Sequence, residues 1–372
     1  MTAPRRATPF AAAHARLLAS VAAGVVALSA HALAQGGPNP FPEPIKPEAA
    51  RPAPKSTAPK AAPPKAAVPK ADTQKQKKSA PEKAAAPAPA APDNPNADLA
   101  YGAYQSGLYR TAFNLALKRA QETGDPKSMT LLGELYSNAL GIKRDDAKAA
   151  EWYKQAADRG DREAMFALGM MKIAGRDGPA NRNEGARLLA SSAKLGKAAA
   201  AYNLGLLYLE GQVFPQDIKR AAELFLQAAN AGNPEAQYAL ATFYKEGRGV
   251  EKNLTEAARW MRAAAQADNL DAEVEYAIAL YNGTGTPKDV PTAIALLTRA
   301  ARQNSPIAQN RLARILVDGL GAPVDKVHGF KWHLIAKTAG NGDPDLDAKF
   351  AQLSPIEKAK SEDLAKKWFG TK

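Results

Sequence analysis

Small, apolar and polar positions recur along the chain with a period of 36 residues, without a gap from residue 125 to residue 340. The last position of each unit holds glycine or a residue type that tolerates left-handed backbone geometry. These positions are Gly124, Gly160, Gly196, Gly232, Asp268, Asn304 and Gly340. A residue of this kind commonly follows the end of a helix, so the pattern predicts one such helix end in every unit.

Each unit begins with a helical pattern. We call the last residue of each unit the terminator. A small residue stands four positions after it, and a residue that is mostly leucine stands four positions further on, so the two fall on one helix face. These two columns are Ser128, Ala164, Ala200, Ala236, Ala272 and Ala308, then Leu132, Leu168, Leu204, Leu240, Tyr276 and Leu312. The next column holds only Gly or Ala, which would allow a neighbouring helix to approach closely.

A second helical pattern follows a glycine-containing loop in each unit. An unbroken Asp/Asn column is suited to capping its N-terminus. The column consists of Asp145, Asn181, Asp217, Asn253, Asp289 and Asp325. Six such helix–loop–helix units cannot bury their apolar faces alone, so we predict an all-α stack with one continuous core.

The two ends of the repeat region fit the same plan. Residues 97–124 read as a shorter helix pair that turns at Gly107. Residues 341–372 are expected to form a C-terminal cap, because Ser354 and Glu357 make a capping box that opens a charged helix. The predicted solenoid therefore comprises 97–124, six repeats over 125–340, and 341–372.

The chain before the repeats falls into two segments. Residues 1–34 resemble a secretory signal, with three arginines, a short apolar run and Ala32-Leu33-Ala34 before an expected cleavage after Ala34. An uncleaved inner-membrane anchor is the alternative, although the run is shorter than the roughly 20 residues of a spanning helix. Residues 35–96 carry 16 of the 28 prolines with Ala and Lys, which predicts a disordered linker.

Charge and cysteine content narrow the picture only slightly. The net charge of +13 divides into +3 on residues 1–34, +5 on residues 35–96 and +5 on the long remainder. The repeat region is thus only mildly basic, and we predict no nucleic-acid partner. The chain has no cysteine, so disulfides do not stabilise it, although export implies an oxidising compartment.

The sequence contains no recognisable catalytic or cofactor motif. His328 and His333 are five residues apart on one expected helix, so they point to different faces and are not spaced as a metal-binding pair. The loop glycines recur with the repeat and are interpreted as structural. We therefore predict a non-enzymatic protein with no catalytic residue, metal or cofactor; a cell-wall-directed hydrolase is the least favoured alternative.

The repeat columns resemble the Sel-1-like repeat, a subclass of the tetratricopeptide superfamily. The segment from Ala236 to Ala241, followed by Tyr244, Gly247, Gly249 and Trp260, is close to that family's pattern. The resemblance implies a right-handed superhelical solenoid that holds a protein or peptide in a concave groove. Lys172 replaces the usual aromatic residue of the second repeat, where residues 176–178 also alter the loop.

By analogy with tetratricopeptide geometry, the first helix of each repeat should line this groove. The candidate partner-binding residues are Phe166, Tyr202, Tyr238, Thr242, Lys245, Ile278, Tyr281, Arg311 and Arg314. An aromatic and aliphatic groove flanked by Lys and Arg would suit an apolar peptide with an acidic element. The alternative is that the tyrosines pack between repeats.

Taken together, these features favour a bacterial protein-binding scaffold that is exported to the periplasm or secreted, possible roles being envelope signalling or assembly. The Lys/Pro linker offers a different hypothesis, in which it tethers the protein to the cell wall or to another anionic polymer. The sequence names neither the partner nor the oligomeric state.

Overall fold

The computed structural model describes residues 98–370, and over this range every regular element is an α-helix. The expected signal segment 1–34 and linker 35–96 lie outside the described residues. The helices are α2 (Leu99–Gln105), α3 (Tyr109–Thr123), α4 (Pro126–Ser137), α5 (Asp146–Asp158), α6 (Arg162–Ala174), α7 (Arg182–Lys194), α8 (Ala198–Glu210), α9 (Ile218–Asn230), α10 (Pro234–Glu246), α11 (Leu254–Gln266), α12 (Leu270–Asn282), α13 (Val290–Arg302), α14 (Pro306–Asp318), α15 (Lys326–Thr338), α16 (Pro344–Ala351) and α17 (Pro355–Gly370).

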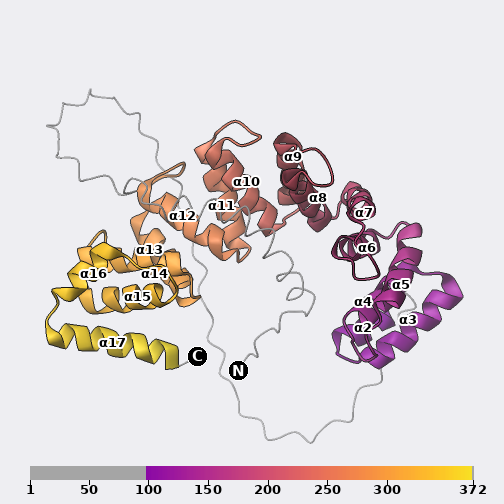
Figure 1. Cartoon of the computed structure of the whole chain (residues 1–372), viewed down its shortest axis with the longest axis horizontal. Helices are drawn as coiled ribbons and strands as arrows, with labels where there is room; N and C mark the ends of the chain where they lie inside the picture. Colours follow the sequence, from indigo (N-terminus) through magenta and orange to yellow (C-terminus); the bar gives the residue numbers. More distant parts are fainter. Residues whose placement is uncertain (1–97, 371–372) are drawn as a thin grey trace, which may run out of the picture. The chain divides into compact units, whose positions relative to one another are not determined.

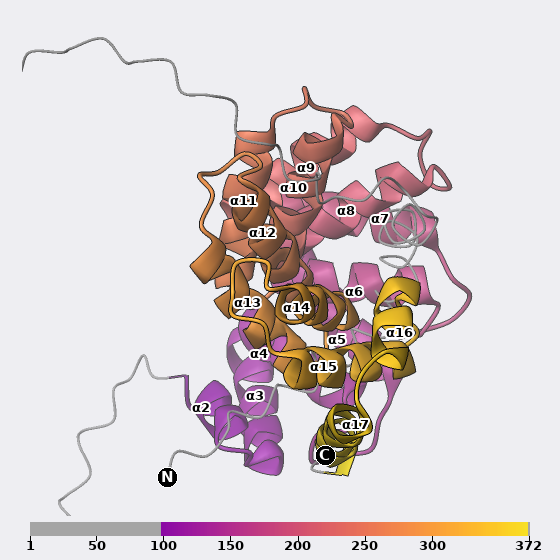
Figure 2. The same ribbon diagram turned by 90° about the vertical axis from the view of Figure 1, so that its left-hand side faces the viewer.

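The helices form the predicted solenoid of tandem pairs (Figure 1). Each first helix, such as α6, packs on the second helix of its own repeat, here α7, and on the second helix of the preceding repeat, here α5. Successive pairs continue this arrangement from α4 to α15, as Figure 2 shows from a second direction. Each helix from α4 to α15 packs on the helices before and after it, and the buried apolar side chains of the described region gather along the stack in three large clusters and one small one.

Side-chain caps fix where the second helices begin. The Asp/Asn column predicted from the sequence caps all six, each side chain accepting a hydrogen bond from a backbone N–H three residues later. The terminator column is also confirmed, since all seven residues have positive φ, including Asp268 (62°) and Asn304 (69°). Both ends of the second helices are therefore set by local residues.

The glycine column brings the two helices of a repeat into close contact. A Cβ atom on Gly133 would lie 2.6 Å from ring atoms of Tyr153, and one on Gly205 would lie 2.7 Å from Phe225. Both rings are buried. The absence of a side chain at these positions is therefore what lets the aromatic ring of the second helix fill the interface.

The C-terminal cap contains one more helix than the sequence pattern indicated. The capping box of Ser354 and Glu357 opens α17 as expected, with Ser354 N–H donating to Glu357 Oε2 at 3.1 Å. Before it, the short helix α16 follows α15 in the place where a further repeat would put its first helix, and α17 packs along α15. Over residues 98–370, no helix is both long and apolar enough to cross a membrane.

Candidate functional site

The first helices of successive repeats are joined laterally by polar contacts. Lys245 on α10 forms an ion pair with Glu275 on α12 at 2.8 Å. Thr130 on α4 donates a hydrogen bond to Asp161 before α6 at 3.1 Å. The first helices therefore lie side by side. Accessible side chains on α4, α6, α10, α12 and α14 define what we call the first-helix face: Glu134, Met170, Ile173, Tyr238, Thr242, Lys245, Asp271, Glu275, Ile278, Tyr281, Arg311 and Arg314.

Two of the predicted groove residues are not accessible on this face. Phe166 is only 5% exposed and Tyr202 only 8% exposed, so the expectation that they line an open groove is wrong for both. Lys197 Nζ lies 5.5 Å from the centre of the Phe166 ring. The Tyr202 ring packs 5.5 Å from that of Phe225, and burial raises the pKa of Tyr202 to about 12. Here the alternative of packing between repeats applies.

The predicted residues on α10 remain accessible to solvent. Tyr238 is half-buried against Ala264, Ala265 and Ala272, and burial raises the pKa of its hydroxyl, with the nearby carboxylates adding to the effect. Thr242 is half-buried and donates to the Tyr238 carbonyl at 3.1 Å. Lys245, one turn further on, is exposed. This helix thus presents an aromatic ring, a hydroxyl and an ammonium group in sequence.

The predicted residues on α12 contact the next repeat. Ile278 is half-buried and packs on the core of the last repeats. The Tyr281 hydroxyl donates to the carbonyl of Leu320 at 3.0 Å, and Lys288 Nζ lies 5.9 Å from the centre of the Tyr281 ring. Tyr281 therefore links two repeats, while part of its ring stays accessible.

The two predicted arginines on α14 differ in their surroundings. Arg314 forms an ion pair with Asp343 at 2.6 Å, and Asp343 also caps α16. Arg311 is half-buried, and desolvation together with the positive charge of Arg314 lowers its pKa. Helix α14, the first helix of the last repeat, is consequently the basic end of the first-helix face.

Sequence reasoning missed the carboxylates on this face. Asp271 and Glu275 stand on α12 beside Tyr238, and Glu134 stands on α4 within hydrogen-bonding reach of the Tyr104 hydroxyl. Glu134 occupies the same repeat position as Thr242 and Arg314, which were predicted to line the groove. The sequence pattern could therefore have identified this carboxylate as part of the same face. The prediction of an apolar groove with basic flanks is corrected to a mixed surface whose acidic groups lie next to the aromatic ones.

Desolvation shifts the pKa of several charged groups on the first-helix face. Asp271 is exposed to solvent, yet desolvation is the main effect that raises its pKa, with Glu275 adding to it. Desolvation likewise raises the pKa of Glu134 and lowers that of Arg311. Water reaches these groups while neighbouring helices displace much of the solvent around them, which disfavours their charged forms.

The two histidines have structural surroundings. His328 is exposed, with Nδ1 2.8 Å from Asp325, the cap of its own helix. His333 is fully buried, with Nε2 2.8 Å from Asp347. In the described part of the chain, no group of three or more His, Cys, Asp or Glu is placed to hold a metal ion.

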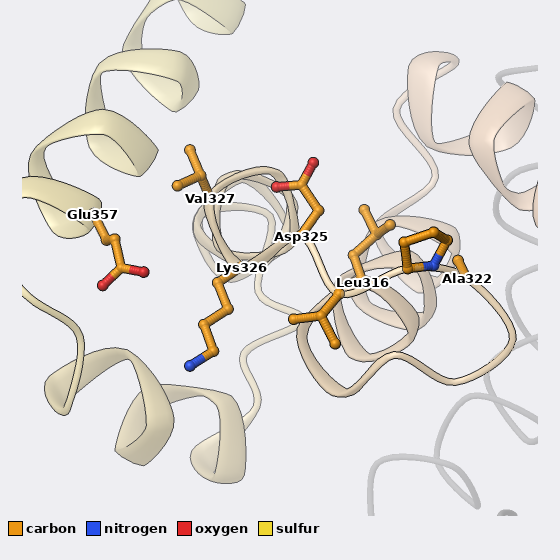
Figure 3. Close-up of a pocket in the computed structure, with 8 residues that line it drawn as sticks. Leu316, Ala322, Asp325, Lys326, Val327 and Glu357 are labelled. Carbon is orange, nitrogen blue, oxygen red and sulfur yellow. The ribbon is translucent and has the colours of Figure 1, made fainter.

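An open pocket of about 650 Å³ lies away from the first-helix face, between the loop before α15 and α17 (Figure 3). Glu357 stands on one side of it and Leu316 with Ala322 on the other, with Lys326 between them. Its two carboxylates already serve helix caps: Asp325 caps α15 and Glu357 completes the capping box of α17. The pocket therefore offers no pair of groups arranged for acid–base chemistry.

Comparison with known proteins bears on the whole described region. A family model described as Sel1 repeat matches six consecutive segments, residues 126–161, 162–197, 198–233, 234–269, 270–305 and 306–341. No curated protein matches the chain.

The solved structures that share the fold include the following two. One is a protective antigen present in uropathogenic Escherichia coli strains that displays an SLR fold, with 28% identity and a TM-score of 0.64. The match covers 73% of this chain but only 59% of that one, so this chain spans about three fifths of its length. The other is a Sel1 repeat protein from Oxalobacter formigenes, with 25% identity, a TM-score of 0.56, and coverage of 65% and 97% of the two chains.

Proposed function

Because the chain belongs to the Sel1 repeat family, we propose that it is a non-catalytic scaffold of the bacterial cell envelope that binds a protein or peptide on its first-helix face. Solenoids of this kind present extended surfaces built from one helix of every repeat. The single observation that supports the proposal is the row of accessible, partly desolvated side chains on α10, α12 and α14.

The composition of this row favours a peptide over a small molecule. Tyr238 and Tyr281 offer amphipathic rings, which are enriched where proteins bind one another. Lys245, Glu275 and Arg311 add charges of both signs on neighbouring helices. An extended peptide that crosses several helices can contact an aromatic ring and both kinds of charge at once.

Export is the second part of the proposal. The arginines, the short apolar run and the small residues Ala32 and Ala34 support a signal that directs the repeat region to the periplasm or outside the cell. The N-terminal residue of the mature protein, measured by mass spectrometry, tests it. A chain that begins at Gln35 supports a cleaved signal, whereas an intact N-terminus in the membrane fraction supports an anchor.

The binding proposal is tested by affinity capture from an envelope fraction with a matched pair of variants. Tyr238→Ala with Lys245→Ala removes two groups from the first-helix face. Tyr101→Ala with Lys219→Ala removes the same two residue types from exposed positions on α2 and α9. The first variant should lose capture of proteins that the wild type and the second variant retain.

Two further measurements make the outcome decisive. Circular dichroism and thermal melting must show that the first variant is folded, and Lys245→Glu, at an exposed position, gives a milder change in the same place. Capture that survives both changes would refute the proposal. So would capture that depends only on residues 35–96, because it would identify the linker as a tether to an envelope polymer.

A further inference from the structure

Basic and acidic residues are separated between the two layers of helices. From the second repeat on, the second helices α7, α9, α11, α13 and α15 contain twelve Lys or Arg residues and three Glu residues. The first helices α6, α8, α10, α12 and α14 contain five Lys or Arg residues and eight Asp or Glu residues. The mild net charge of the repeat region therefore hides a basic layer and an acidic layer.

Many of the second-helix cations remain available to an external anion. Arg187, Lys194, Lys219 and Arg262 are exposed, and within residues 98–370 none of them forms an ion pair with a carboxylate. Exposed groups of this kind, spread over several consecutive repeats, produce a positive potential along one side of the stack.

At the C-terminal end this basic layer is joined by aromatic rings. The rings of Trp332 on α15 and Trp368 on α17 lie 5.2 Å apart. Lys331 Nζ lies 4.2 Å from the centre of the Trp332 ring and 5.0 Å from that of Trp368. Desolvation and the nearby Arg302 both lower the pKa of Lys331, so two cations are crowded together beside the rings.

The last turns of α17 add cations and an exposed ring at the same end of the stack. Lys366 and Lys367 precede Trp368 in sequence and Phe369 follows it. Lys367 pairs with Asp363 at 2.7 Å, and Phe369 is 49% exposed. Figure 1 shows α17 running beside α15 at the C-terminal end of the stack. We define the C-terminal patch by its residues Arg302, Lys331, Trp332, Lys366, Lys367, Trp368 and Phe369.

We propose that the C-terminal patch binds the surface of an anionic phospholipid bilayer, with its cations at the headgroups and Phe369 at the boundary of the acyl chains. Lys and Arg near accessible aromatic residues are typical of segments that lie on membrane interfaces. In the patch, Trp368 is half-buried and Phe369 exposed, whereas Trp332 is buried. A soluble polyanion would also attract the cations, but it gives no reason for an exposed phenyl ring at Phe369, one helical turn from Lys366. This inference does not depend on the peptide-binding proposal, which concerns the opposite layer of helices.

Flotation of the full chain with vesicles tests the proposal. Vesicles of pure phosphatidylcholine are compared with vesicles of equimolar phosphatidylcholine and phosphatidylglycerol. Binding is expected only to the anionic vesicles, and it should weaken as salt is raised. Arg302→Glu with Lys366→Glu should lower the affinity by about tenfold or more, since each charge near an anionic surface contributes roughly fivefold. Phe369→Ser should weaken binding without changing its salt dependence.

The control carries the same change of charge at the other end of the stack. Arg110→Glu with Lys143→Glu replaces two exposed cations at the N-terminal end of the repeat region. The control should bind anionic vesicles much more tightly than the patch variant. Equal losses in the two variants would overturn the proposal, because net charge alone, including that of residues 35–96, would then explain the binding.

Two other results would also overturn it. One is equal binding of the wild type and the patch variant to anionic vesicles. The other is a pair of results: low concentrations of soluble polyphosphate displace the protein from the vesicles, and Phe369→Ser binds the vesicles as tightly as the wild type. Together they would identify the ligand of the patch as a soluble anion. All substituted side chains are exposed, so the variants should keep the melting temperature of the wild type.

Discussion

The contact between Gly205 and Phe225 provides a sharp test of how the two helices of a repeat fit together. A Cβ atom on Gly205 would lie 2.7 Å from Phe225 Cε1 and 3.0 Å from Cδ1. The ring cannot easily move, since it is fully buried and packs 5.5 Å from the ring of Tyr202 and 5.4 Å from that of Phe243. Gly205→Ala should therefore push α8 and α9 apart.

The expected cost is the difference of two effects. Adding a methyl group to a filled core destabilises a protein by about 1–3 kcal/mol. Alanine favours a helix over glycine by about 1 kcal/mol, which opposes that loss. Gly102 supplies the matched control, because it lies in helix α2 and a Cβ atom there would have no neighbour within 4 Å. Only the second effect operates at Gly102, so the two variants should differ by about 1–3 kcal/mol.

Urea unfolding followed by circular dichroism measures this difference. Gly205→Ala should unfold at a lower urea concentration than Gly102→Ala, which should match or exceed the wild type. Phe225→Leu added to Gly205→Ala should give a double variant more stable than the sum of the two losses predicts, because the smaller side chain makes room for the methyl group. If Gly205→Ala proves as stable as Gly102→Ala, glycine is not required for the close approach of α8 and α9.

Three further predictions follow from particular contacts. Asp161→Ala removes the cap of α6 and should lower the free energy of unfolding in urea by about 1–2 kcal/mol. Asp158→Ala is the control: it loses only a surface ion pair with Lys154, and its free energy of unfolding should stay within about 0.5 kcal/mol of the wild type. Leu346→Ala empties a fully buried site in the C-terminal cap and should cost about 2–5 kcal/mol; a loss no larger than that of the 40%-exposed Ile307→Ala would contradict this packing. Hydrogen bonds from Lys337 and His333 lower the pKa of Asp347 in the folded state. The carboxylate of Asp347 thus binds a proton more tightly in the unfolded chain, and the stability that it contributes to the folded state is lost as pH falls below about 4. The melting temperature of Asp347→Asn should therefore decline less steeply in acid than that of the wild type. An equally steep decline would argue against this contribution.

Local rules explain why so much of the helix pattern could be predicted from the sequence. The Asp/Asn caps and the left-handed terminators act within three or four residues, so a column such as Asp145 to Asp325 carries its own structural meaning. The glycine column at Gly133, Gly169 and Gly205 also pointed correctly to close contact between helices. Helix α16 was missed because it is short and begins two residues later than the repeat spacing would place it.

The candidate site was predicted less well, for a physical reason. Position in a repeat tells which way a side chain leaves its helix, but its exposure depends on what the adjacent repeats place around it. Phe166 and Tyr202 share a column with Tyr238, yet only Tyr238 stays accessible. Desolvation likewise shifts the pKa of Asp271 and of Arg311, which their positions in the repeat did not indicate.

The sequence by itself determined the repeat, the helix ends and the glycines at the close contacts, because each depends on residues that are near neighbours or recur at a fixed spacing. Only the tertiary structure decided which members of a column are covered, which carboxylates stand beside the aromatic rings, and how Arg302, Lys331 and Trp368 come together from α13, α15 and α17. Such groupings depend on the stacking of whole helices, and no single stretch of sequence contains that information.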